Sequence, residues 1–358
     1  MTFEEARAAF PVLEHFAYLN AGTNGPLARR TVEAMAAQEQ VDLEDGRGDH
    51  EYFEHALALR AEVRGKLAAA VGAPQETVSL ATSATNGCNI VLTGLGLGAE
   101  DEIVTTDGEH FGLLGALAVS PARVRVAKVR ELPPEEALDL LLEEVTPRTR
   151  LLALSHVCWM SGNRFPVAEL KAVTGLPVLV DGAQSVGAIA VDASQFDFYA
   201  FSCQKWLCGP DGSGGLVVAD PERLGVMAPS YLSQESYEPE GEFVARPGAA
   251  RFDPGWAPPP LLAGLSAALD LAPEHRFEHA AEIAERCRAL LAERFELVTA
   301  PGQAGLVTFR VAEDSAEVVK RLYDHGVVVR DVPDLGWIRV SCGWWTSEED
   351  LARLLDAL

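Results

Sequence analysis

With 358 residues, of which 48% are hydrophobic, the chain is longer than one hydrophobic core usually organises, so we expect two packed units. Its 53 acidic and 29 basic residues give a formal net charge of −24, which opposes binding to nucleic acids and to anionic membranes. No apolar run approaches the ~18 residues that span a bilayer. The acidic start Met1–Glu5 lacks the basic and apolar regions of a signal peptide, so these features together predict a cytoplasmic protein.

The N-terminal part of the chain is mostly helical in pattern. A short helix over Phe3–Phe10 leads into an extended piece, Ala17–Asn20, and a glycine-bearing turn, Gly22–Pro26. An amphipathic helical stretch then runs from Ala28 to Val71, broken by a polar segment that contains two glycines. We expect residues 1–20 to form an N-terminal segment that packs near a C-terminal unit.

From Val78 onward, short apolar runs alternate with helical patterns, which is typical of an α/β layer with a mostly parallel sheet. We expect a large domain over residues 21–257 and, after the run of three prolines at 258–260, a smaller α+β domain over residues 258–358. A sheet of this class binds ligands beyond the ends of its strands. The seven predicted strands are Val78–Ala81, Glu102–Thr105, Val124–Ala127, Leu151–Leu154, Val178–Val180, Phe196–Phe201 and Gly215–Val218.

One of the five lysines differs from the others in its surroundings. Lys205 follows an apolar strand and precedes a glycine-bearing turn, whereas the other four lie in helical or basic strand patterns typical of surface charge. Burial between Phe201 and Trp206 would lower the pKa of Lys205 and free its amine to attack a carbonyl group. On this evidence alone, a functional and a structural role for Lys205 are equally supported.

Two further clusters favour a functional site. Asp181 ends a predicted buried strand, and a buried carboxylate needs a cation or hydrogen-bond donors. A protonated pyridine nitrogen would be such a cation, although Asp181 could also simply cap a helix. Residues 81–87 form a Ser/Thr-rich turn before a helix, where amides and hydroxyls can hold a phosphate, but any helix cap has this composition.

Together these residues resemble the class V aminotransferase family of fold-type I enzymes that use pyridoxal phosphate. The segments that carry the resemblance most specifically are Asp181–Gln184 and Ser202–Trp206, in the expected order. The resemblance covers nearly the whole chain, from Tyr18 to the last helix. It implies the fold-type I architecture, pyridoxal 5′-phosphate as cofactor, an amino-acid substrate, and a homodimer with its sites at the subunit interface.

The resemblance also implies roles for individual residues. Lys205 would hold the cofactor as a Schiff base and move the substrate Cα proton. Asp181 would keep the pyridine nitrogen protonated, and His110 would stack on the ring. Arg339 would grip the substrate carboxylate, with Gly22 beside it. The remaining cofactor-binding residues implied by the resemblance are Ala84, Thr85, Gln184, Ser202 and Gln204.

Three departures from the family pattern bear on function. Gln204 stands where many members have a histidine, and Trp256 stands where a threonine often reaches the partner subunit's phosphate. The connection Arg330–Gly336 is short and contains no cysteine, whereas desulfurases carry a nucleophilic cysteine on the corresponding loop. Cys342 comes too late to replace it. The six cysteines form no CxxC pair or Cys/His cluster, so we predict no metal site.

These features favour a C–S lyase, which eliminates the β-sulfur group of a cysteine-type substrate and yields pyruvate, ammonia and a sulfur product. Segments such as Glu109–Gly112 and Ser155–Trp159 look most like that group. A class V aminotransferase is the first alternative, and desulfurase or epimerase-like activity follows. A nicotinamide-dependent dehydrogenase is disfavoured because the chain lacks the GxGxxG fingerprint, and a non-catalytic interaction protein stays open.

Overall fold

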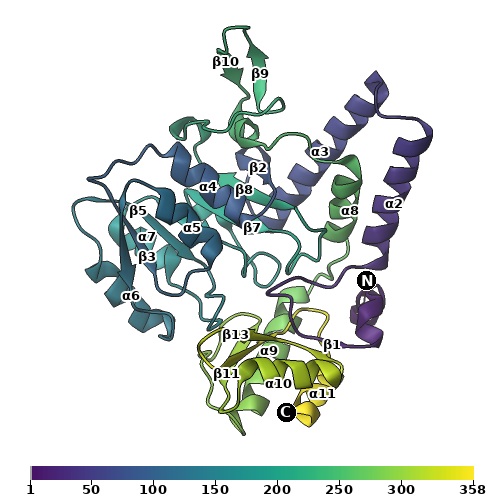
Figure 1. Cartoon of the computed structure of the whole chain (residues 1–358), viewed down its shortest axis with the longest axis vertical. Helices are drawn as coiled ribbons and strands as arrows, with labels where there is room; N and C mark the ends of the chain where they lie inside the picture. The colour runs from purple at the N-terminus through teal and green to yellow at the C-terminus, as the bar shows by residue number, and fades with distance from the viewer. Residues whose placement is uncertain (1) are drawn as a thin grey trace.

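A sheet of seven strands forms the centre of the large unit in the computed structural model, which describes residues 2–358 (Figure 1). The strand order is β2-β8-β7-β6-β5-β3-β4, and every pair is parallel except the two that β8 makes. All seven predicted strands and the mostly parallel sheet are therefore confirmed. The strands are β2 (Val78–Ala81), β3 (Glu102–Thr106), β4 (Arg123–Ala127), β5 (Thr149–Ser155), β6 (Val178–Asp181), β7 (Phe198–Ser202) and β8 (Gly214–Val218).

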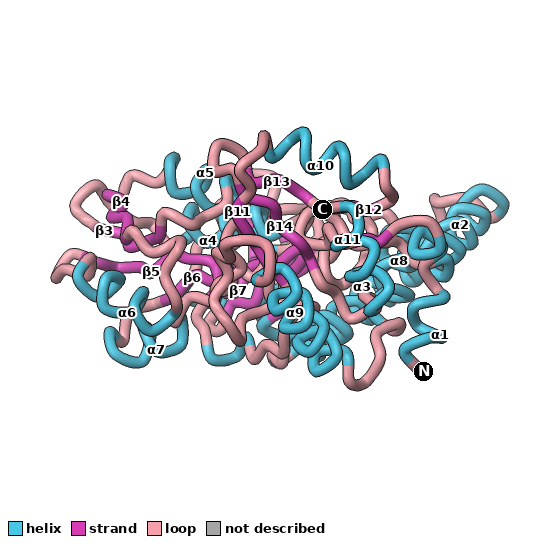
Figure 2. The backbone as a smooth tube through the Cα atoms, turned by 90° about the horizontal axis from the view of Figure 1, so that it is seen from below, coloured by secondary structure: helices cyan, strands magenta, loops and turns pink. Residues whose placement is uncertain are grey.

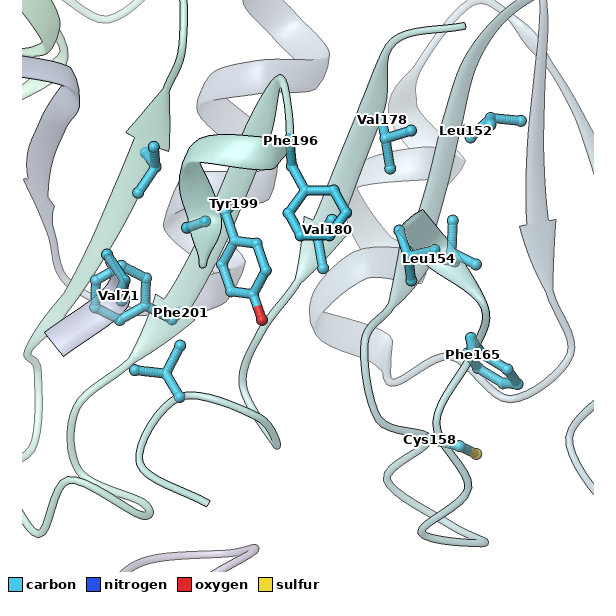
Figure 3. Packing of buried hydrophobic residues seen from close by; sticks show 14 of the residues in the cluster. Val71, Leu152, Leu154, Cys158, Phe165, Val178, Val180, Phe196, Tyr199 and Phe201 are labelled. Carbon is cyan, nitrogen blue, oxygen red and sulfur yellow. The ribbon is translucent and has the colours of Figure 1, made fainter. Parts of the chain in front are cut away.

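Helices cover both faces of this sheet, because alternate residues of each strand point to opposite sides. Leu151 packs in one cluster with α4 (Ala84–Gly94) and α5 (Phe111–Val119), whereas Leu152 packs in another with α3 (His50–Val71), α6 (Pro134–Glu143) and α7 (Val167–Thr174). Figure 2 shows α6 and α7 on one side of β5 and β6 and α4 and α5 on the other. Figure 3 shows the face on which Leu152, Leu154, Val178, Val180, Tyr199 and Phe201 gather.

The helix after the three prolines packs with the large unit. Helix α8 (Pro259–Leu269) lies against α2 (Arg29–Glu44) and α3, and its Leu262 and Leu265 belong to the same core as the sheet (Figure 1). The predicted boundary near residue 258 stays a prediction. From this packing we propose that the division falls after α8, in the connection that leads to α9 (Arg276–Ala292).

The C-terminal unit has a three-stranded antiparallel sheet in the order β11-β14-β13. The N-terminal segment joins this unit, because β1 (Ala17–Tyr18) pairs in parallel with β12 (Val327–Val328) and Leu19 lies in its core. Phe10 packs against Trp344 and Trp345 nearby. The remaining elements of these regions are α1 (Phe3–Ala8), β11 (Leu306–Arg310), α10 (Ser315–Asp324), β13 (Arg330–Val332), β14 (Trp337–Ser341) and α11 (Glu348–Ala357).

Two segments differ from the sequence analysis. Residues 330–332, expected as part of a connection, form the edge strand β13, so the turn to β14 consists of Pro333–Gly336 alone. Asp334 and Gly336 adopt positive φ angles of 64° and 63° in this turn. A hairpin of β9 (Gln234–Tyr237) and β10 (Phe243–Ala245), which the sequence did not predict, projects from the large unit (Figure 1).

Short 3₁₀ helices complete the described chain, and they lie at Pro11–Glu14, Gln75–Thr77, Ala193–Gln195, Pro221–Arg223 and Gly248–Phe252. Among residues 2–358, no helix combines the length and the apolar character needed to cross a bilayer. The cytoplasmic location stays a prediction from the sequence.

Candidate active site

Lys205 lies three residues beyond β7, in a turn held against the N-terminal Gly22–Pro26 loop. The amide of Gly25 donates to the carbonyl of Gln204 at 2.7 Å. A Cβ atom at position 25 would come within 2.0 Å of the Lys205 carbonyl oxygen, so only glycine fits there. The segment before α2 therefore forms one wall of the region around Lys205.

The side chain of Lys205 is half-buried, and its amine has no hydrogen-bond partner within residues 2–358. Burial lowers its pKa to about 8, and Arg339 and Arg330 add to this effect while Asp181 opposes it. Lys66, by contrast, bonds the Ser266 hydroxyl at 2.7 Å and the Asp270 carboxylate at 2.6 Å. Lys205 thus has an amine without a hydrogen-bond partner, and its lowered pKa gives it a much larger neutral fraction near neutral pH than an ordinary lysine, as attack on a carbonyl requires.

Asp181 ends β6 and is only 5% exposed. One carboxylate oxygen accepts a hydrogen bond from the Ala183 amide at 2.9 Å, so the residue does cap the following turn. Burial raises its pKa, which the Ala183 amide and Lys205 partly offset. Because no ion pair joins Asp181 to a cation among the described residues, its second oxygen can receive a protonated ring nitrogen.

His110 caps the N-terminus of α5 and faces Trp159. Its Nδ1 accepts the Gly112 amide at 3.1 Å, which leaves the ring proton on Nε2. The imidazole lies edge-to-face with Trp159, with ring centroids 5.3 Å apart. Burial, together with the positive charges of Lys205, Arg330 and Arg339, lowers the pKa of His110 to about 4. His110 is therefore neutral at physiological pH and presents an uncharged ring.

The start of α4 lies beside the end of β7 and brings the proposed phosphate-binding residues together. The Ala84 amide donates to the Ser202 hydroxyl at 2.9 Å, and Thr85 lies against Gly112. The buried Oε1 of Gln204 has no hydrogen-bond partner within residues 2–358. Rotation of this amide would replace the acceptor with the Nε2 donor. The amides and hydroxyls of this corner can therefore hold a phosphate at a helix N-terminus.

Gln184 connects the end of β6 to the N-terminal loop. Its Nε2 donates to the Gly22 carbonyl at 2.8 Å, and its Oε1 accepts from the Trp206 indole at 2.9 Å. A Cβ atom at Gly22 would lie 2.9 Å from the Arg339 guanidinium and 3.1 Å from Gln184. Gly22 thus allows the backbone to pass between these two side chains.

Arg339 enters the site from β14 and is 1% exposed. It donates to the Trp159 carbonyl at 2.9 Å and to the Thr23 hydroxyl at 3.2 Å. Its Nε has no partner among the described residues, and burial lowers its pKa to about 9. A buried guanidinium without a carboxylate partner is costly, so this geometry favours a bound anion.

Arg330 is a second cation at the same place, which the sequence analysis missed. It lies directly opposite Arg339 in the β13–β14 register, and it also donates to Thr23, at 3.3 Å. The guanidinium carbons of Arg330 and Arg339 lie 5.6 and 5.9 Å from the Trp159 ring centroid. Like charges facing each other across strands are destabilising unless an anion or a π face compensates. The residues Asp334–Gly336 are typical of a hairpin turn. Recognising that turn would have predicted that Arg330 and Arg339 face each other on paired strands.

The six cysteines are all buried and none forms a disulfide. Cys342, the residue after β14, is fully buried in the core of the C-terminal unit, and its interaction with the Cys287 thiol, together with burial, raises its pKa well above the usual value. The turn between β13 and β14 contains no cysteine. No thiol is therefore placed to receive a sulfur atom from a substrate at Lys205.

Comparisons with known proteins agree with this geometry. Residues 17–353 match the family Aminotransferase class-V. The chain is 30% identical to isopenicillin N epimerase of Streptomyces clavuligerus, covering 99% of this chain and 97% of that protein. It is 31% identical to a cysteine desulfurase of Klebsiella pneumoniae, covering 100% and 98%. The structure of the cystine C–S lyase C-DES with its reaction product cysteine persulfide matches with 31% identity and a TM-score of 0.90, covering 97% and 98%.

The fold and the matches define a fold-type I enzyme that depends on pyridoxal phosphate. The chain belongs to the class V aminotransferase family. Its own residues fit that cofactor, because an unpaired lysine amine, a buried carboxylate without a cation and an unsatisfied amide lie around one corner of the sheet.

Proposed function

We propose that this enzyme is a C–S lyase that eliminates the β-sulfur group of a cysteine-type amino acid. With cysteine itself, one molecule each of substrate and water would give pyruvate, ammonia and hydrogen sulfide. The observation that carries the choice is that all six cysteines are buried, because desulfuration needs an accessible thiolate whereas elimination does not. The C-DES lyase, at 31% identity, supports the same choice.

Pyridoxal phosphate, when bound, supplies a carbonyl that condenses with amines and a ring that takes up negative charge from the substrate Cα. Lys205 would attach the cofactor through Nζ and, when freed, would accept the substrate Cα proton at that atom. Asp181 would keep a proton on the ring nitrogen, and the neutral imidazole of His110 would pack against the ring. The depressed pKa of Lys205, about 8, makes it a suitable base near neutral pH.

The cofactor's polar groups are held by residues at the ends of β6 and β7. Ser202, the amides of Ala84 and Thr85, the Thr85 hydroxyl and the Gln204 amide bind the phosphate, and Gln184 donates to the phenolic oxygen. Ala84 and Ser202 meet at the start of α4, and Gln184 lies between Gly22 and Trp206 beyond the end of β6. The partial positive charge at the N-terminus of α4 would also attract the phosphate.

Arg339 binds the substrate carboxylate, with Gly22 beside it. Arg330, opposite Arg339, supports a substrate that carries a second carboxylate, as cystine does. A pair of arginines that face each other across adjacent strands is stabilised when each guanidinium pairs with an anionic group. The proposed preference for a substrate with two carboxylates therefore rests on the two arginines that have no carboxylate partner among the described residues.

The active enzyme is proposed to be a homodimer. Phe53 and Trp256, with ring centroids 5.4 Å apart, remain 45% and 41% exposed, and the Tyr52 ring contacts Trp256 at a tilt and Phe53 edge-on. An exposed aromatic cluster of this kind is typical of an interface core. Sedimentation should give twice the chain mass, and F53S/W256S should shift the population toward monomer. A monomeric wild-type protein would contradict the proposal.

Product analysis tests the proposed reaction. The holoenzyme is incubated with cystine and with cysteine, and pyruvate, ammonia, alanine and the sulfur product are measured. Elimination predicts equal amounts of pyruvate and ammonia without a keto-acid acceptor, and Cys342→Ser should retain turnover within about threefold because the thiol is not used. Alanine as the carbon product, abolished in Cys342→Ser, would indicate a desulfurase. Pyruvate only with an acceptor would indicate an aminotransferase, and racemised substrate without pyruvate an epimerase.

A further inference from the structure

Glu109, the residue before His110, is a buried carboxyl with no role in the chemistry proposed so far. It lies in the turn from β3 to α5 and is 4% exposed. One oxygen accepts from the Ser155 amide at 2.9 Å and from the Ser155 hydroxyl at 2.5 Å. The other accepts from the Thr106 hydroxyl at 2.5 Å, and that hydroxyl in turn accepts from the Gly108 amide. The carboxyl therefore connects the ends of β3 and β5.

These contacts reach both sides of the cofactor site. Ser155 ends β5 and lies opposite Asp181 in the β5–β6 register. On the other side, Glu109 is covalently next to His110, whose imidazole caps α5 and contacts Trp159. Removing the Glu109 carboxyl would therefore allow the turn that carries His110 to move relative to the end of β5, which lies beside Asp181.

We propose that Glu109 is a positioning residue, whose carboxyl fixes the 107–110 turn to β5 and so holds the His110 ring in place against the cofactor. Burial raises the pKa of Glu109 to about 7, against the effect of its three hydrogen bonds, so an uncharged group is tolerated at this position. The inference rests on the proposed role of His110 and is independent of which reaction the enzyme performs.

The opposite end of the same strand offers a matched control. Glu102, the first residue of β3, is 2% exposed and accepts hydrogen bonds from Thr146 at 2.6 Å and from Arg148 at 2.9 Å. It resembles Glu109 in burial and in its bond to a threonine, but it lies at the end of the strand away from His110. Removing Glu102 should weaken the fold without changing the cofactor's surroundings.

The test compares the visible circular dichroism of the bound cofactor in wild type, Glu109→Ala, Glu109→Gln, Glu102→Ala and His110→Ala. Glu109→Ala and His110→Ala should both lose most of the signal, because a cofactor ring that is not held in one orientation gives little dichroism. Glu109→Gln keeps the acceptor for Ser155 and a group that can bond Thr106, so it should match wild type. Glu102→Ala should match wild type in the visible band despite a lower melting temperature.

Steady-state kinetics gives a second readout. Glu109→Ala should lower kcat by about ten- to a hundredfold with KM within about threefold, because misplacement of about 1 Å costs that much in rate. If Glu109→Ala behaves as Glu102→Ala while His110→Ala loses the visible signal, this inference is wrong and the proposed function stands. If His110→Ala keeps the signal, the proposed role of His110 fails, and the inference with it.

Should Glu109→Ala not fold, Ser155→Ala and Thr106→Val remove its partners singly. Each should give a reduced visible signal, since each weakens one of the connections to the turn. A wild-type signal in both variants would overturn the proposal.

Discussion

The two halves of the site differ in how their polar groups are satisfied. On the large unit, Asp181, Gln184 and Ser202 each already hold a hydrogen bond to nearby backbone or indole. On the C-terminal unit, Arg330 and Arg339 have no carboxylate partner among the described residues and face each other across two strands. Under the proposed function, the first half binds the resident cofactor, and the second half gains its counter-charges only when an anionic substrate binds.

The largest effect is expected at Lys205, on the large unit. Lys205→Ala removes both the proposed attachment point and the proposed proton acceptor, so turnover should fall by at least about a thousandfold. Lys171→Ala, which removes a surface amine paired with Asp197, is the control and should keep wild-type activity. The measurement is pyruvate release under saturating cofactor. Retained activity in Lys205→Ala would show that the site on the large unit has been assigned wrongly.

The second-largest effect is expected at Arg339, on the C-terminal unit. Arg339→Ala loses charge-assisted bonds of about 1.5–3 kcal/mol each, so kcat/KM should fall by about ten- to a thousandfold for every amino-acid substrate. Its visible cofactor band should be unchanged. Arg310→Ala, on the neighbouring strand β11 and paired with Glu131, serves as the control for loss of an arginine from this sheet.

Arg330 sharpens the comparison, because its effect should depend on the substrate. Arg330→Ala should lower kcat/KM for cystine by roughly tenfold while leaving the value for cysteine nearly unchanged. Equal losses with both substrates would mean that Arg330 acts on the first carboxylate or on the fold, and that no second carboxylate is recognised.

A smaller effect is expected on the pKa of Lys205, which the arginines of the C-terminal unit influence. The Lys205 pKa of about 8, well below that of an ordinary lysine, predicts that cofactor attachment to the apoprotein accelerates with pH and levels off above about pH 8. Because Arg339 and Arg330 lower this pKa, Arg339→Ala should move the midpoint upward. Stopped-flow absorbance at several pH values measures both. A rate that keeps rising to pH 10 in wild type would contradict the depressed pKa.

The sequence predicted the large half better than the small one, for physical reasons. Apart from the exposed edge strand β4, the strands of the large sheet are almost entirely buried, so they are mostly apolar runs that stand out from their surroundings. Asp181 and Lys205 follow such runs directly, so their position at the sheet's edge could be inferred. The resemblance to the family supplied the roles of His110 and Arg339.

Arg330 was missed because β13 is a short edge strand with two charged residues, Arg330 and Asp331, and no apolar pattern. Its role depends on the register with β14, which a turn of four residues sets. The β9–β10 hairpin was missed for a similar reason, since both strands are short and largely exposed, and only β10 is apolar. The sequence did not predict a positioning role for Glu109, because its hydrogen-bond partners, Thr106 and Ser155, come from separate strands.

Borohydride reduction of the holoenzyme, followed by peptide mass mapping, tests the central claim most directly. The account predicts loss of the visible band and added mass on the peptide that contains Lys205. Mass on a peptide that carries any of the other four lysines, at positions 66, 128, 171 and 320, would contradict it.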